Sequence, residues 1–277
     1  MFSNVYIEIT NICNLDCSFC HKTKRAPKTM TQEEFSSALR AVSPYAKSVF
    51  FHLMGEPTAH PLLPEFIKET NKAGIRPILT TNGTLLPKMG DSILGCGLYR
   101  VNISLHSFEA NLSKDMEAYL RGCFDFASKA AAEGTFAVFR LWNSGGLEVL
   151  NSEILELCRQ YFTDEWVNTK KGFRLADRIF LEWDKKFDWP DAEAPIYEGE
   201  AFCLGLREQI GILSDGRVVP CCLDSDGAIT LGNIFNDKIE DIMSSERVQA
   251  MLEGFKKHIA LENLCQRCSY RTKFNRL

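Results

Sequence analysis

The chain of 277 residues lacks an excess of positive charge, a long uncharged apolar run and any low-complexity tract. Its 32 lysines and arginines are outnumbered by 36 aspartates and glutamates, which disfavours a nucleic acid partner, because phosphate binding needs clustered basic side chains. No uncharged apolar run is long enough to span a bilayer. The first residues also do not show the pattern of a signal peptide, a charged segment followed by an apolar one. We therefore expect a cytoplasmic protein that binds neither nucleic acid nor a membrane.

The composition is that of a globular protein. Hydrophobic residues make up 45% and charged residues 25% of a chain long enough for one large domain, or for a large domain and a small one. The chain also holds 11 cysteines. In a cytosolic chain of this length, that number indicates metal or redox chemistry rather than a disulfide framework.

Apolar, β-rich runs alternate with segments of helical periodicity. The expected strands are Val5 to Ile9, Ser48 to Leu53, Ile75 to Thr80, Arg100 to Leu105, Thr135 to Leu141 and Arg178 to Trp183. The expected helices are Thr31 to Val42, which opens with a capping box, Leu62 to Ala73, Leu112 to Glu133 and Glu148 to Tyr161. This alternation predicts an α/β fold, a partial (β/α)6 TIM-like barrel with its active site in the loops that follow the strands.

The composition changes after residue 183. We expect the barrel to cover residues 1–183 and a charged, aromatic linker to cover residues 184–202. Residues 203–277 hold five of the cysteines, and we expect them to form a small cysteine-rich α+β domain. Ser214-Asp215-Gly216 predicts a hairpin there, and the stretch from Ile239 to Phe255 predicts one amphipathic helix.

Cys13, Cys17 and Cys20 form a C-x3-C-x2-C cluster directly after the first expected strand. Three thiolates fill three corners of a 4Fe-4S cluster and leave one iron open for a ligand that is not protein. Zinc prefers the same ligands, and the three cysteines could also be plain buried thiols. The cysteine spacing alone therefore does not distinguish an iron-sulfur cluster from a zinc site or from buried thiols.

The arrangement resembles the radical S-adenosylmethionine (radical SAM) superfamily. In that family the open iron chelates S-adenosylmethionine, and electron transfer from the 4Fe-4S cluster breaks the cofactor to give a 5'-deoxyadenosyl radical. The resemblance implies that Phe19, just before the last cysteine, lies near the adenine.

Motifs at the ends of the next two strands also resemble those of the superfamily. Met54-Gly55-Glu56-Pro57 is similar to a G-G-E-P motif whose backbone binds the cofactor's amino group, with Met54 in place of the first glycine. Thr80-Thr81-Asn82-Gly83 is similar to a T-N-G sequence near the cofactor. Both motifs also serve as ordinary turns.

Strands four and five supply further candidates. Ser104 and His106 alternate along the expected fourth strand and so share one face, and the resemblance implies contacts with the ribose hydroxyls. Arg140, late in strand five, could pair bidentately with the cofactor's carboxylate. The alternatives are a structural histidine and a surface ion pair.

Cys203, Cys221, Cys265 and Cys268 form a second set. Four cysteines can ligate a whole cluster. The pattern C-x12-G-x4-C, followed later by C-x2-C, resembles the auxiliary-cluster domains called SPASM and, in shortened form, Twitch, which implies a single auxiliary 4Fe-4S cluster. A zinc ribbon uses the same four ligands and is the alternative interpretation of this pattern. We expect Cys222 to face elsewhere, and Cys96, Cys123 and Cys158 to be buried thiols.

The resemblance implies an enzyme that removes hydrogen from an unactivated C–H bond of a small molecule or peptide, with a flavodoxin- or ferredoxin-type electron donor. A fully ligated auxiliary cluster favours two-electron oxidation with that cluster as electron acceptor. Glu182 and Asp184, at the end of strand six, are candidate bases by position, or else surface charges. The alternatives are a maturase that epimerises or crosslinks a ribosomal peptide, and a non-enzymatic iron-sulfur or zinc module.

Overall fold

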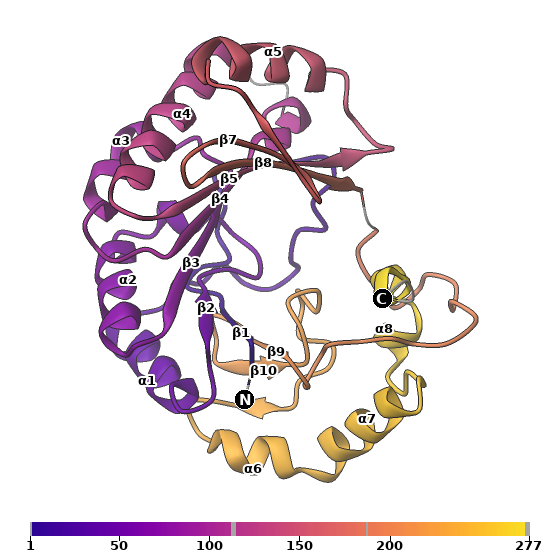
Figure 1. Ribbon diagram of the computed structural model, residues 1–277. Helices are drawn as coiled ribbons and strands as arrows, with labels where there is room; N and C mark the ends of the chain where they lie inside the picture. Colours follow the sequence, from indigo (N-terminus) through magenta and orange to yellow (C-terminus); the bar gives the residue numbers. More distant parts are fainter. Residues whose placement is uncertain (1, 112–114, 187, 275–277) are drawn as a thin grey trace. The chain divides into compact units, whose positions relative to one another are not determined.

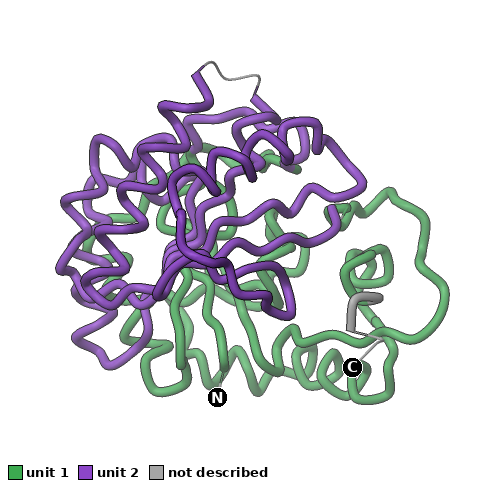
Figure 2. The backbone as a smooth tube through the Cα atoms, turned by 45° about the horizontal axis from the view of Figure 1, so that its top comes forward, with its two compact units in different colours: residues 1–12, 21–55, 187–277 green, residues 13–20, 56–186 purple. Residues whose placement is uncertain are grey.

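The protein, in a computed structural model, is described for residues 2–111, 115–186 and 188–274. The chain forms two compact units, coloured separately in Figure 2. Unit 1 comprises residues 1–12, 21–55 and 187–277, and unit 2 comprises residues 13–20 and 56–186. The domain boundaries expected from the sequence stay a prediction.

Unit 2 is built on parallel strands covered by helices. Its strands run in the order β3 (Arg76–Thr81), β4 (Arg100–Ser104), β5 (Phe136–Ser144), β8 (Ile179–Lys185), β7 (Gly172–Ala176) and β6 (Val167–Thr169). The first four are parallel, and β7 and β6 continue the sheet antiparallel. One face carries α2 (Leu63–Lys72), α3 (Leu86–Ile93), α4 (Met116–Ala132) and α5 (Asn151–Tyr161), as Figure 1 shows.

Strand alternation divides the side chains of unit 2 between two faces. Phe139 of β5 is fully buried and packs edge-on against Phe124 of α4, with ring centroids 5.2 Å apart. Because successive strand residues point to opposite faces, the neighbouring Arg140 points away from α4. Glu182 of β8 is the register partner of Arg140 and therefore lies on the same face. Candidate polar side chains thus project from the face that the helices leave uncovered.

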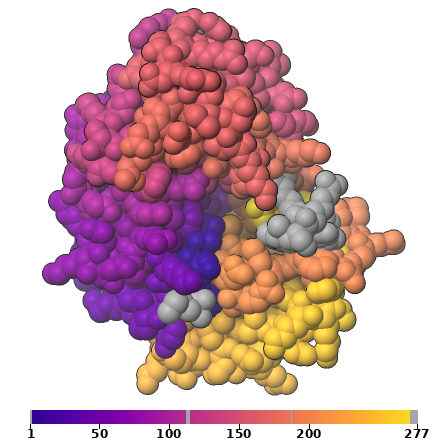
Figure 3. Space-filling view, in the orientation of Figure 1, coloured from indigo at the N-terminus to yellow at the C-terminus, as the bar shows by residue number. Residues whose placement is uncertain are grey.

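Unit 1 is organised around β1 (Asn4–Ile7), which has parallel neighbours on both sides. These are β2 (Ser48–Phe50) and, from the far end of the chain, β9 (Gln209–Ile212). The antiparallel strands β10 (Arg217–Val219) and β11 (Gly232–Asn233) extend the sheet beyond β9. The helices are α1 (Gln32–Val42), α6 (Ile239–Ser244), α7 (Glu246–Lys256) and α8 (Asn263–Gln266), and α6 and α7 form part of the surface in Figure 3.

Helix α1 begins as its sequence predicts. The Thr31 hydroxyl accepts a hydrogen bond from the Glu34 backbone N–H at 3.2 Å, and the Glu34 carboxylate accepts one from the Thr31 N–H at 2.8 Å. This reciprocal pair is a capping box. The expected apolar face, Phe35, Ala38, Leu39 and Val42, is buried. The strand order expected from the sequence is likewise present, with ends that differ by a few residues.

Three expectations need correction. The single helix expected from Ile239 to Phe255 is two helices, because Ser245 has an extended backbone and caps α7 through a hydrogen bond from Val248 N–H. Helix α3 was not expected, since Pro87 and Gly90 hide its periodicity; Pro87 is tolerated because it lies in the first turn. The β6–β7 hairpin was also not expected. The expected start of the α4 segment at Leu112 lies outside the described residues.

The hairpin predicted at residues 214–216 joins β9 to β10. Gly216 has a φ of +86° and donates its N–H to the Leu213 carbonyl at 2.8 Å. A Cβ atom at this position would lie 2.4 Å from Phe235 Cδ2. The turn therefore needs glycine both for its backbone conformation and for its close packing.

We predict that Gly216→Ala destabilises the protein more than Gly199→Ala does. Both positions have positive φ, so each alanine adds left-handed strain of about 1–2 kcal/mol, but only residue 216 would also clash, since nothing lies within 4 Å of a Cβ at residue 199. Urea unfolding of the two variants measures the difference. Equal midpoints would show that the packing against Phe235 adds nothing.

Candidate functional site

The first cysteine set lies in unit 2 on a segment without helix or strand. Cys13 is exposed, and Cys17 and Cys20 are half-buried. The Asn111 side chain donates to Cys17 Sγ at 3.0 Å, and the Leu15 N–H donates to Cys13 Sγ at 3.4 Å. Burial raises the pKa of the Cys13 and Cys17 thiols, and these hydrogen bonds oppose the shift because they favour thiolate.

Amide side chains from outside the segment hold it in place. Asn111 also accepts a hydrogen bond from the Asp16 N–H at 2.8 Å. Asn82, at the end of β3, donates to the Asn14 side chain at 3.0 Å, and its Nδ2 lies 4.0 Å from Cys13 Sγ. The structure thus brings the predicted residue Asn82 to the cysteines. Asn111 was missed because nothing in its local sequence signals a contact 94 residues away.

Three further predicted residues meet beside this segment. The rings of Phe19 and His106 have centroids 5.0 Å apart, and His106 Nδ1 lies 3.0 Å from the Arg140 carbonyl oxygen. This distance favours the tautomer that donates from Nδ1. The Arg140 guanidinium lies over the Trp142 ring, 4.1 Å from its centroid. A planar cation and an aromatic face are thereby held next to each other on β5.

The expectation that Ser104 and His106 share one strand face is wrong. Strand β4 ends at Ser104, and His106 lies in the 3-10 turn Leu105–Ser107. The Ser107 hydroxyl donates to the Ser104 carbonyl at 2.7 Å, which closes that turn. His106 is nevertheless buried, and burial lowers its pKa from 6.5 to about 4. The ring is therefore neutral near pH 7.

Glu56 has a buried carboxylate with its own set of donors. It accepts hydrogen bonds from the Thr58 N–H at 3.0 Å, the Thr58 hydroxyl at 2.6 Å and the Asn82 N–H at 2.7 Å. Burial raises its pKa, and these hydrogen bonds oppose the shift. The side chain thus fixes the 3-10 turn Pro57–Ala59 and the backbone of Asn82, which leaves the backbone of this motif as the part able to bind a ligand.

Gly55 belongs to unit 1 and marks a close approach of two backbone segments. Its φ is +74°, and a Cβ atom here would lie 2.3 Å from the Thr10 carbonyl oxygen and 2.9 Å from that of Ile12. Any side chain would push apart the segment that leads into Cys13. The glycine of the predicted motif is thus required by packing.

The two candidate bases lie on β8. Glu182 Oε1 lies 3.5 Å from Arg100 Nη2, and both side chains are partly exposed. Asp184 accepts a hydrogen bond from the Lys185 N–H at 2.7 Å. Since they alternate on one strand, the two carboxylates point to the same face as Arg140. Their role in proton transfer stays a prediction.

We predict that burial of neutral His106 makes stability depend on pH. The folded pKa is lowered, so the unfolded state binds more protons below pH 6.5, and the free energy of unfolding falls as pH falls from 6.5 to about 4, by a total of about 3 kcal/mol. His106→Asn removes this slope.

Urea unfolding of the wild type and the variant at several pH values measures the effect, with His258→Asn as the control, since that side chain is 40% exposed. A stability difference between wild type and His106→Asn that stays constant with pH would contradict the assignment.

The second cysteine set surrounds one cavity within unit 1. The cavity is small and partly open to solvent. The thiols that line it are Cys203, Cys221, Cys265 and Cys268, and the neighbouring side chains are mostly apolar, among them Leu223, Ile229, Phe255 and Leu264. The spacing of the four cysteines along the chain therefore corresponds to one site in space.

The surroundings of these four thiols disfavour their ionised form. Burial raises the pKa of all four, and the proximity of Cys221 to Cys203 and Cys265 raises it further. Thiolates become stable here only when a cation compensates them. Four cysteine ligands are the donor set of a 4Fe-4S cluster and equally of a tetrahedral zinc ion.

The remaining cysteines lie in apolar surroundings. Cys222 packs against the buried residues Leu53, Leu213 and Val219, as expected for a side chain directed away from its neighbour. Burial raises its pKa to about 11, and a hydrogen bond with Tyr6 opposes the shift. Cys96, Cys123 and Cys158 are buried thiols, as expected.

Family models match both parts of the chain. Residues 7–131 match the model of the radical SAM superfamily, and residues 203–269 match SPASM, an iron-sulfur cluster-binding domain. The first match contains the three-cysteine segment and the second contains all four cavity cysteines.

Curated relatives carry the name probable GTP 3',8-cyclase. The protein from Sulfolobus acidocaldarius is 32% identical over an alignment of 302 positions, gaps included, that covers 96% of this chain and 95% of the relative. The one from Metallosphaera sedula is 32% identical over 114 residues, and there the match spans only 36% of the relative's length.

Solved structures share the fold. BtrN in complex with AdoMet and 2-DOIA aligns over 97% of this chain and 93% of its own, with a TM-score of 0.61 and 17% identity. SuiB from Streptococcus suis bound to S-adenosylmethionine aligns over 96% of this chain and 72% of its own, with a TM-score of 0.65 and 16% identity.

Fold and cysteine sets together define an enzyme that works with iron-sulfur clusters in a partial (β/α)6 barrel. The chain belongs to the radical SAM superfamily and carries a SPASM-type auxiliary domain. Its cofactors are S-adenosylmethionine and iron-sulfur clusters, which the two cysteine sets would hold. Among the described residues no helix is both long and apolar enough to cross a membrane.

Proposed function

We propose that this enzyme oxidises a carbon centre of its substrate by two electrons. When bound, S-adenosylmethionine and the first cluster supply a 5'-deoxyadenosyl radical that removes a hydrogen atom, and the auxiliary cluster supplies an acceptor for the electron left on the substrate. The substrate loses one hydrogen atom, one proton and one electron in total. A flavodoxin- or ferredoxin-type protein is the proposed source of the electron that cleaves S-adenosylmethionine.

One observation carries this proposal, namely the arrangement of Cys203, Cys221, Cys265 and Cys268 around a single cavity in unit 1. Four cysteine ligands saturate a 4Fe-4S cluster and leave no iron open for substrate. A saturated cluster in an apolar pocket is suited to carry electrons. Oxidation needs such a carrier, whereas a reaction without net redox change does not.

The residues proposed to serve the first site all belong to unit 2. Cys13, Cys17 and Cys20 would hold the cluster, and the Asn111 amide orients the Cys17 sulfur. Arg140 supplies a fixed cation for the carboxylate of S-adenosylmethionine. Phe19, Pro57, Asn82, Ser104 and His106 are proposed to contact the rest of that cofactor.

Proton removal needs a base, for which Glu182 and Asp184 stay the proposed candidates. The Glu182 carboxylate is held in an ion pair with Arg100, whose Nη2 lies 3.5 Å from Glu182 Oε1. The Asp184 carboxylate accepts a hydrogen bond from the Lys185 N–H at 2.7 Å. Either carboxylate would take up the proton that the substrate loses, since both lie on the same face of β8 as Arg140 does on β5.

Peptide modification is a second candidate. The fold is also that of anSMEcpe with bound AdoMet and Cp18Cys peptide, which aligns over 97% of this chain with a TM-score of 0.59 and 17% identity. A peptide substrate would use the same radical step. GTP is a third substrate to test, because the curated relatives are named for it.

We predict two clusters that can be removed separately. Anaerobically reconstituted protein should bind about eight irons per chain, and the variant with Cys13, Cys17 and Cys20 changed to alanine should bind about four. The variant with Cys265 and Cys268 changed to alanine should also bind about four. Iron and sulfide analysis measures both, and about four irons with one zinc in the wild type would exclude an auxiliary iron-sulfur cluster.

The proposed role of the auxiliary cluster as electron acceptor has its own test. With dithionite as reductant, the Cys265→Ala, Cys268→Ala variant should still form 5'-deoxyadenosine from S-adenosylmethionine but should lose the oxidised product. Metabolite extracts, peptides and GTP provide the substrates for this comparison, with product mass as the readout. Undiminished oxidation by the variant would rule out the auxiliary cluster as the acceptor.

A further inference from the structure

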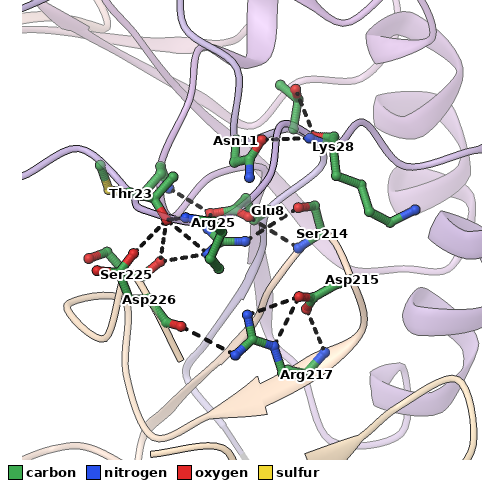
Figure 4. A network of polar contacts seen from close by, with 12 residues as sticks. Glu8, Asn11, Thr23, Arg25, Lys28, Ser214, Asp215, Arg217, Ser225 and Asp226 are labelled. Atoms are coloured by element: carbon green, nitrogen blue, oxygen red, sulfur yellow. Dashed lines mark hydrogen bonds and ion pairs between the residues drawn. The ribbon is translucent and has the colours of Figure 1, made fainter. Parts of the chain in front are cut away.

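Glu8, one residue beyond β1, carries a carboxylate that is completely buried within unit 1. Its Oε2 accepts hydrogen bonds from Arg25 Nη2 at 2.7 Å and from the Met54 N–H at 3.1 Å. Its Oε1 accepts one from the Ser214 N–H at 3.1 Å. Figure 4 shows Glu8 between Arg25 and Ser214. One carboxylate therefore joins four separate segments of the chain.

Arg25 extends this network to a further loop. Its side chain is only 9% exposed, and its Nε donates to the Ser225 carbonyl at 2.9 Å and to the Thr23 hydroxyl at 3.0 Å. The Thr23 hydroxyl donates in turn to Asp226 at 2.6 Å, and the Lys24 N–H donates to the same oxygen at 3.0 Å. Figure 4 shows Thr23 and Arg25 facing Ser225 and Asp226.

The residues of this network flank both cysteine sets in the sequence. Glu8 precedes Cys13 by five residues and Arg25 follows Cys20 by five, so the ion pair joins the two ends of the stretch that holds the first cysteine set. Met54 directly precedes Gly55 of the cofactor motif. Ser225 and Asp226 follow Cys221 by four and five residues in the loop that carries the second set.

The chemistry of the contact requires a carboxylate. All three groups that face Glu8 are N–H donors, so the amide nitrogen of a glutamine would place one more donor among them. A buried arginine without its partner would also be an uncompensated charge. A purely apolar replacement of both side chains could fill the space, but it would leave the donors of Met54 and Ser214 without this acceptor.

The structure assigns to Glu8 and Arg25 a positioning role, in which their buried ion pair fixes the flanks of the first cysteine set together with the loop after Cys221. This inference rests on the family assignment and on the contacts within unit 1, and it does not depend on which substrate is oxidised. Neither residue is proposed to touch the cofactor or the substrate.

The decisive variant replaces both partners, Glu8→Leu with Arg25→Met. Removal of a buried ion pair as a whole is often neutral for stability, whereas removal of one partner is strongly destabilising. We expect the double variant to melt a few degrees below the wild type, because the Met54 and Ser214 N–H groups lose their acceptor, but to fold and to bind the same amount of iron. We also expect faster amide hydrogen exchange in residues 21–28 and 221–229.

Cleavage of S-adenosylmethionine by dithionite-reduced holoenzyme supplies the second readout. It should fall by about 100-fold in the double variant, the scale expected when a reacting group is misplaced by about 1 Å. Wild-type exchange and wild-type cleavage in a stable double variant would overturn the assignment. Asp91→Asn, which breaks an exposed ion pair with Lys129, is the control and should change neither measurement.

Arg25→Lys keeps the inference testable if the double variant does not fold. Lysine retains the charge beside Glu8 but has no Nε to reach the Ser225 carbonyl. We expect faster exchange in residues 221–229, with iron content unchanged. Exchange in that loop equal to the wild type would show that Arg25 does not hold it.

Discussion

Hydrogen bonds from amide side chains to the first cysteine segment are the constraint on which the candidate active site depends. A segment without helix or strand has no backbone ladder to satisfy its polar groups, so other parts of the chain must supply partners. Asn111 bonds both Cys17 Sγ and the Asp16 N–H, and Asn82 bonds the Asn14 side chain. The position of the cysteine segment thus depends on Asn82, directly after β3, and on Asn111, in the 3-10 turn Glu109–Asn111, both distant in sequence.

The two cysteine sets differ in their surroundings. Amide side chains adjoin the first set, whereas apolar side chains such as Ile229 and Phe255 line the cavity of the second. Hydrogen bonds to sulfur and exclusion of water are two of the means by which a protein tunes a cluster. Hydrogen-bond donors surround the first set, whereas the second lies in a mostly apolar cavity that is partly open to solvent. Two cysteine sets in one chain can therefore hold iron-sulfur clusters with different properties.

The sequence predicts those features that local patterns determine. Cysteine spacing, the strand order and the capping box of α1 are all local, and the last two are present in the structure. Distant pairings are not accessible in this way: the contact of Asn111 with Cys17 joins residues 94 positions apart. The 3-10 turn at His106 was missed because the alternation of side chains favoured a longer fourth strand. In the structure the strand ends at Ser104, and the Ser107 hydroxyl closes a turn there.

The place of β1 in its sheet has a consequence for how the protein is made. Asn4 pairs with Gln209 and Ile7 with Ile212, so a neighbour of the first strand leaves the ribosome only after about three quarters of the chain has been synthesised. Strands β3 to β5 of unit 2, by contrast, pair with their sequence neighbours and can assemble during synthesis. Iron that arrived early would meet Cys13 before its flanks were ordered. We therefore expect the cell to load this protein with iron and sulfide after translation has ended.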